Sequence, residues 1–170
     1  MKRYTFTIIF FICALTASAQ QGWTERSRLL PDQLRNIATG ILVYHSPSPV
    51  YPEPNLDATT PYGKYVWKHS TYAMAQTEDL EVVAAGSYIW IKDKGWMPNM
   101  KLSKDEFADE FDCKDAMLKK GRIFTFKKNY RFGDAIYGGD ALWFVIAKDK
   151  QGKLYKGYGL VETEGELRSK

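Results

Sequence analysis

Hydrophobic and polar residues alternate along much of residues 40–163, which is the period of a β-strand that buries one face. The most apolar run is residues 140–148, and we expect it to form a central strand. In the long stretch 62–74 the alternation places four side chains on one face, namely Tyr65, Trp67, His69 and Thr71. The predicted strands, roughly seven in number, are residues 40–45, 62–74, 80–84, 87–92, 122–128, 140–148 and 153–163.

Turn-forming residues separate these strands. Residues 93–95 (Asp-Lys-Gly) and 149–152 (Asp-Lys-Gln-Gly) each predict a hairpin, because glycine adopts a positive φ without steric cost. Gly86 predicts a bend between two strands. Residues 46–54 contain four prolines, whose fixed φ and missing N–H exclude helix and central strand, so we expect an extended surface loop.

One segment has the signals of a helix. Ser103 and Glu106 have the spacing of a capping box, and the charges that follow suit the helix dipole, which predicts a helix over 103–120. A second cap near Asp112 leaves open two short helices instead of one. A shorter helical turn is expected at residues 31–34. The apolar stripe of the main helix, expected to pack on the sheet, consists of Phe107, Phe111 and Leu118.

Together these elements predict an α+β, β-rich fold: a single antiparallel β-barrel or sandwich-like domain with one capped helical insertion (103–120). A composition of 45% hydrophobic and 15% aromatic residues excludes a disordered chain. The net charge of +4 falls to about +2 without Lys2 and Arg3, which is too small an excess to indicate nucleic acid or an anionic membrane as a partner.

The first residues resemble a bacterial Sec-type signal peptide. Lys2 and Arg3 precede the apolar residues 5–15, and an Ala-Ser-Ala sequence ends at Ala19. The apolar run is too short to be a transmembrane segment. We therefore expect residues 1–19 to be cleaved, leaving one domain over 20–170 that is periplasmic or secreted. Its features are the proline-rich loop 46–54 and a short charged tail over 164–170. We expect no cofactor, because ATP and nicotinamide cofactors are not freely supplied outside the cytoplasm.

Residues that carry acid–base, nucleophilic or metal chemistry are few. His45 and His69 are the only histidines, and Cys113 is the one cysteine left after cleavage. Nothing near Cys113 has the sequence signature of a cysteine hydrolase, and no histidine follows it as a copper site requires. We therefore predict no metal and no assigned catalytic residue. A periplasmic hydrolase that uses His69 is the alternative to a non-enzymatic protein.

Two surfaces are candidates for binding. Aromatic rings around the 93–95 turn predict a ligand-binding face for a glycan or a protein partner, formed by Tyr88, Trp90 and Trp96. A cationic segment without acidic residues offers an alternative site for anionic polymers, formed by Lys119, Lys120, Arg122, Lys127, Lys128 and Arg131. Trp143 is expected in the core. The Gly138-Gly139 pair is interpreted as a loop or bulge before a strand, with backbone brought near a ligand as the alternative. The sequence thus predicts an exported, non-catalytic binding or envelope-associated protein of unknown ligand.

Overall fold

The largest sheet contains the most apolar strand at its centre. The computed structural model describes residues 28–57 and 63–168, so the expected signal peptide at 1–19 lies outside them. Strand β11 (Gly139–Lys148) pairs antiparallel with β12 (Leu154–Thr163) on one side and with β6 (Leu80–Ile91) on the other. The central position predicted for residues 140–148 is therefore confirmed. Edge positions belong to β1 (Ala38–Thr39), β7 (Gly95–Leu102) and β8 (Met117–Leu118).

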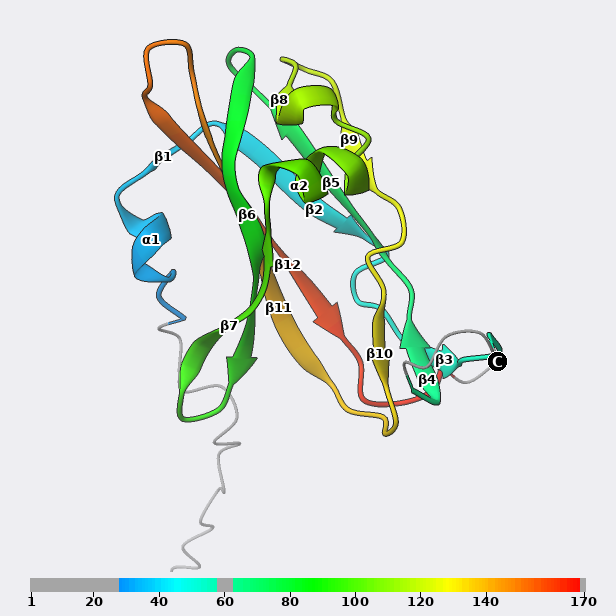
Figure 1. Ribbon diagram of the computed structural model, residues 1–170. Helices are drawn as coiled ribbons and strands as arrows, with labels where there is room; N and C mark the ends of the chain where they lie inside the picture. The colour runs from blue at the N-terminus through cyan, green and yellow to red at the C-terminus, as the bar shows by residue number, and fades with distance from the viewer. Residues whose placement is uncertain (1–27, 58–62, 169–170) are drawn as a thin grey trace, which may run out of the picture.

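Two three-stranded sheets lie opposite the large one, and together the sheets curl into a half-barrel (Figure 1). The first has the order β2-β5-β9 and the second the order β10-β4-β3, with all pairs antiparallel. Among the named strands described, the one parallel pair joins β1 to β12, and single parallel bridges join Val50 to Thr163 and Ala75 to Lys120. The bounds of these six strands are β2 Ile41–Ser46, β5 Ser70–Ala75, β9 Phe124–Phe126, β3 Pro52–Pro54, β4 Tyr65–Trp67 and β10 Arg131–Gly133.

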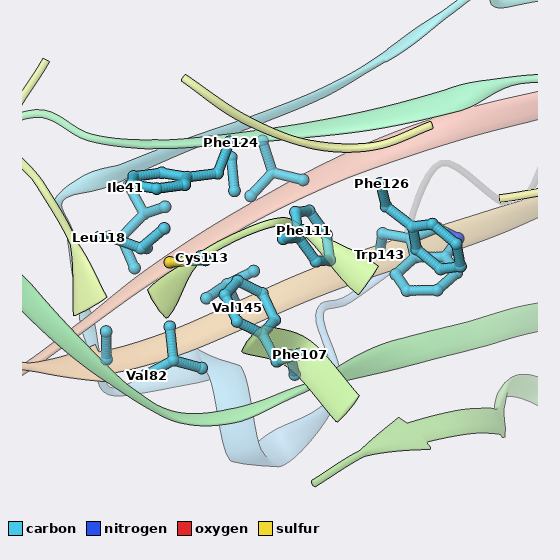
Figure 2. Packing of buried hydrophobic residues seen from close by; sticks show 14 of the residues in the cluster. Ile41, Val82, Phe107, Phe111, Cys113, Leu118, Phe124, Phe126, Trp143 and Val145 are labelled. Carbon is cyan, nitrogen blue, oxygen red and sulfur yellow. The ribbon is translucent and has the colours of Figure 1, made fainter. Parts of the chain in front are cut away.

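The main core fills the space between the sheets (Figure 2). Phe107 and Phe111 stack with ring centroids 4.3 Å apart, and the edge of Phe111 meets Phe126, which in turn meets Trp143. All four rings are buried, and each contributes roughly 1.5–3 kcal/mol through loss of exposed apolar surface. The predicted packing of Phe107 and Phe111 on the sheet and the predicted core position of Trp143 are confirmed, whereas Leu118, the third member of the predicted helix stripe, lies in strand β8.

The helix is shorter than the pattern predicts. Helix α2 (Lys104–Glu110) begins at the expected capping box, in which the Ser103 N–H donates to the Glu106 carboxylate and the Glu106 N–H donates to the Ser103 hydroxyl. A single helix over 103–120 is wrong, because Asp112 turns to a positive φ and a 3-10 turn, η2 (Lys114–Ala116), follows. The chain then enters the large sheet as β8. Its backbone hydrogen bonds are made with β6, so the helix does not continue.

Two strand predictions also need correction. Residues 62–74 form two strands in different sheets, because β4 ends at Trp67 and β5 begins at Ser70. Gly86 is not a bend, since β6 runs through it without a break. A side chain there would place its Cβ 2.2 Å from the Met100 carbonyl oxygen, so glycine is required by the close approach of β7.

The predicted turns have the expected chemistry. Strands β6 and β7 meet in a hairpin where Asp93 and Gly95 have positive φ. In the hairpin between β11 and β12, the Asp149 carboxylate accepts from the N–H groups of Gln151 and Lys153, and Gly152 has a positive φ. The proline-rich loop 46–54 contains one short strand, β3, at the edge of its sheet.

A second apolar cluster lies on the outer face of the large sheet. The expected short turn forms as α1 (Asp32–Arg35), and its Leu34 side chain is fully buried against Leu142, Phe144 and Ile146 of β11. The buried Lys156 ammonium of β12 donates to the Leu34 carbonyl. The segment around α1 therefore covers this face of the sheet (Figure 1).

Candidate functional site

A cavity of about 450 Å³ lies between the inner face of the large sheet and strand β10. Its wall on the sheet side is largely apolar and comes from β6, β7, β11 and β12. The opposite wall comes from His69, from residues 129–132, from Tyr137 and Gly138 before β11, and from Gly139 at its start. This volume is within the range of small-molecule sites. The apolar side chains of the sheet wall include Ile89, Ile91, Met100, Ala141, Trp143 and Val161.

His69 is the most unusual polar group of this wall. It lies in the connection between β4 and β5, and only 5% of its surface is exposed. Neither ring nitrogen has a hydrogen-bond partner in the described part of the chain. Burial lowers the pKa of His69 to about 4, and the nearby Trp67 backbone, which lies outside hydrogen-bond geometry, acts in the opposite direction. At neutral pH the ring is uncharged and has one donor and one acceptor to offer.

His45 is buried beside His69, but its own nitrogens are satisfied. The two ring centroids are 5.7 Å apart in an edge-on arrangement. Nε2 lies 3.3 Å from the Gly159 carbonyl oxygen and Nδ1 lies 3.0 Å from the Thr71 hydroxyl. Because a carbonyl can only accept, Nε2 carries the proton and Nδ1 accepts from Thr71. The Thr71 oxygen accepts in turn from the Asn129 amide at 2.6 Å. Burial, then the proximity of His69, lower the pKa of His45 to about 4.

Arg131 supplies the positive charge of the cavity. Its guanidinium donates to the Thr163 hydroxyl, which donates to the Gly139 carbonyl at 2.9 Å. It also lies 3.9 Å from the ring centroid of Tyr137 and 4.8 Å from that of Trp67. Among the described residues no carboxylate forms an ion pair with it. Burial lowers the pKa of Arg131, although an arginine remains charged at neutral pH.

The predicted aromatic face lies on the other side of the large sheet. Trp90 and Trp96 form an edge-to-face pair at 5.2 Å, and Tyr88 accepts from the Gln33 amide. Arg28 stacks over Trp90 at 4.9 Å, so residues around α1 cover the trio and leave a second cavity of about 480 Å³ beside it. The structure therefore brings the three rings together, half-buried rather than open. Trp90 also borders the first cavity. A binding role for the trio stays a prediction.

The cationic segment does not act as one unit. Lys119 forms an ion pair with Asp79 at 2.9 Å, and the backbone N–H of Lys120 donates to the same carboxylate. Arg122 lies over the Phe124 ring at 4.9 Å. Lys127 and Lys128 are exposed, whereas Arg131 faces the cavity. Binding of anionic polymers by this segment stays a prediction.

Cys113 and His69 are not brought together. Cys113 is fully buried in the main core, next to Phe111 and Leu118 in Figure 2, and does not line the cavity. Burial raises the pKa of its thiol to about 11, so the nucleophilic thiolate is disfavoured. Within residues 28–57 and 63–168, no group of three His, Cys, Asp or Glu side chains is placed to hold a metal ion.

Sequence reasoning named His69 and Arg131 but missed the residues that accompany them, which are Asn129, Tyr137 and Thr163. Of the residues around Tyr137, the Gly138-Gly139 pair is the one whose sequence pattern allows backbone close to a ligand. Comparison with protein-family models, with curated proteins and with solved structures finds no match. In the described segments, no helix has the length and apolar character needed to cross a membrane.

Proposed function

We propose that the protein is an exported, non-catalytic binding protein that holds a small, largely apolar ligand in the cavity beside β10. In this proposal the curled sheets are an antiparallel β-barrel opened on one side, with the ligand site at the opening. The observation that carries it is His69, a buried imidazole on the cavity wall whose two nitrogens lack partners in the described chain.

The free energy of an unsatisfied buried group supports this proposal. A buried donor or acceptor without a partner costs about 1–3 kcal/mol. A ligand that bonds to the His69 ring, after a turn of that ring toward the cavity, would recover part of that cost, while its apolar body would cover the side chains on the sheet. Binding is favoured over catalysis because the lining residues include no serine or cysteine beside His69, and because Asp140, the one lining carboxylate, is engaged by Arg28.

The test uses the mature protein and an uncharged, environment-sensitive dye, N-phenyl-1-naphthylamine. Its fluorescence should rise on binding and saturate at one dye per chain. Replacing Ala141→Phe in the lining should abolish the rise by filling the cavity, whereas Ala135→Phe, outside the lining, should preserve it. Equal dye binding by Ala141→Phe and Ala135→Phe would show that the dye binds outside this cavity and would contradict the proposal.

The hydrolase alternative rests on the same residue, because a neutral imidazole can act as a general base. It is separated by assaying purified protein on peptidoglycan, glycan and ester substrates, with His69→Ala alongside. Robust turnover that this change abolishes would make the protein an enzyme.

The two sequence-predicted surfaces are tested by salt and by substitution. Binding to a glycan or protein that weakens at least tenfold in Trp96→Ala, with little salt dependence, would favour the aromatic trio. Binding that is lost as salt rises and survives Trp96→Ala would favour the cationic segment.

A further inference from the structure

We propose that the ligand of the cavity is a small amphipathic monocarboxylate, with its acid group held by Arg131 and its apolar body on the inner face of the large sheet. This inference rests on the proposed function and specifies the chemical class of the ligand.

The first support is the charge balance of the cavity. Two charged side chains line it, Arg131 and Asp140. The Asp140 carboxylate forms an ion pair with Arg28, which does not line the cavity. Arg131 has no such partner among the described residues; the groups around it are the neutral Thr163 hydroxyl and the rings of Tyr137 and Trp67. The cavity therefore has one positive charge that an anionic ligand would neutralise.

The second support is the way Arg131 is held. Thr163 fixes one terminal nitrogen of the guanidinium, and the two aromatic rings restrict its plane. A guanidinium fixed in this manner has further N–H groups for a planar, bidentate acceptor, which a carboxylate provides. Little of the side chain's rotational freedom remains to be lost when such a ligand binds.

The third support is the segregation of polar and apolar groups. Arg131, Asn129 and His69 lie on one wall together with the rings of Tyr130, Phe132 and Tyr137. The sheet wall is mostly apolar, with Ile89, Met100 and Trp143, and its uncharged polar members are Asn99 and Thr163. A ligand that satisfies both walls has an acid group and an apolar body. A sugar would leave the apolar wall without a partner, and a pure hydrocarbon would leave the guanidinium and the imidazole without one.

The test compares acids with alcohols of the same skeleton on the mature protein. The probes are decanoate against decan-1-ol and 4-phenylbutyrate against 4-phenylbutan-1-ol, each below its aggregation concentration. Binding is followed by calorimetry and by intrinsic tryptophan fluorescence, to which the cavity-lining Trp90 and Trp143 contribute. We expect at least one acid to bind tenfold or more tightly than its alcohol. Arg131→Gln should reduce that ratio to about one without changing the affinity for the alcohol. Arg131→Lys should retain part of the ratio, because it keeps the charge. Lys127→Gln, which removes an exposed cation outside the cavity, should leave the ratio unchanged.

The other possible results separate this inference from the proposed binding function. Equal affinity for acids and alcohols would overturn this inference and leave the proposed binding function standing. Binding of none of the four probes, together with no dye binding, would overturn both. An acid preference that persists in Arg131→Gln and disappears in Lys127→Gln would assign the acid to the surface and overturn the inference. The first comparison needs only the unaltered protein, so it does not depend on whether a variant folds.

Discussion

At the residue scale, the two buried histidines couple stability to acid. Both have pKa values near 4 in the folded protein against an ordinary value of 6.5. The unfolded chain therefore binds protons more readily than the folded one between these values, and stability falls as the pH is lowered through this window. About one pH unit above 6.5 both rings are largely neutral in both states and the effect vanishes.

We predict that the free energy of unfolding decreases between pH 7.5 and pH 5, and further towards pH 4. A shift of this size corresponds to on the order of 3 kcal/mol for each histidine over the full window. Urea denaturation at several pH values measures it. The carboxylates with lowered pKa, Asp79, Glu81 and Glu106, lose their contribution as the pH falls through the ordinary carboxyl range, so they add to the effect at the acid end of the window and leave its upper part clear. A flat profile from pH 7.5 to 5 would contradict the prediction.

The unpartnered imidazole gives a second prediction. Replacing His69→Leu should raise the free energy of unfolding at pH 7.5 by about 1 kcal/mol, because it removes a buried polar group that lacks a partner. His45→Leu is the matched control and should lower stability, since Thr71 and the Gly159 carbonyl would lose their bonds. Urea denaturation of both variants measures the two free energies of unfolding. If His69→Leu lowers stability as much as His45→Leu does, the His69 ring has hydrogen-bond partners and the prediction is wrong.

The candidate site could be predicted from sequence only in part, for reasons that the residues make clear. His69 was recognisable as one of two histidines, but its burial follows from the break between β4 and β5, which the alternation does not reveal. Arg131 belongs to a cationic segment that predicts a solvent-exposed surface. In the structure its guanidinium bonds to the Thr163 hydroxyl, 32 positions later in the chain, and lines the cavity. Such long-range partners leave no local signal.

At the element scale, β2 and β12 pack unusually closely because two glycines face the backbone of β2. A Cβ at Gly157 would lie 2.4 Å from the Ile41 carbonyl oxygen, and one at Gly159 would lie 2.6 Å from that of Val43. Neither glycine has a positive φ, so the requirement is space rather than backbone conformation.

We predict that Gly157→Ala destabilises the protein by roughly 2 kcal/mol or more, because neither backbone can move away without disturbing the core. The control is Gly139→Ala in β11, where the added Cβ would meet no atom nearer than 3.9 Å. Thermal and urea denaturation of the two variants provide the measurement. Equal stability would mean that β2 shifts freely relative to β12.

Elements defined by local chemistry could be predicted from the sequence, whereas those that depend on a distant partner could not. The capping box at Ser103 and both hairpin turns needed only neighbouring residues. The end of α2 depends on β8, whose partner strand lies more than 30 positions earlier in the chain. The need for Gly86 likewise comes from the approach of β7.

At the scale of the whole molecule, the last strand joins parts of the chain that are far apart. Strand β12 pairs with β1 on one edge and β11 on the other, and it packs against β2. Beyond it, the Trp67 indole N–H donates to the Glu164 carbonyl at 2.9 Å. Removal of this strand would expose the core and leave β1 without a described partner.

We predict that a chain ending at residue 152 forms no cooperative fold. The matched control ends at residue 166 and keeps β12 and the Glu164 contact, so it should unfold with a single transition close to that of the full chain. Near-ultraviolet circular dichroism and denaturation compare the two. A sharp transition in the shorter chain would show that the remaining sheets are stable alone.

The position of β12 also has a consequence for the order of events during synthesis. Strand β1 pairs with β12, which is synthesised last of the described strands. The half-barrel therefore cannot close while the C-terminal part of the chain is still on the ribosome. Pairings between such distant segments form slowly, because the intervening chain must first lose its freedom. An incomplete chain therefore stays unfolded, which is the condition that the proposed export through a Sec-type channel would require.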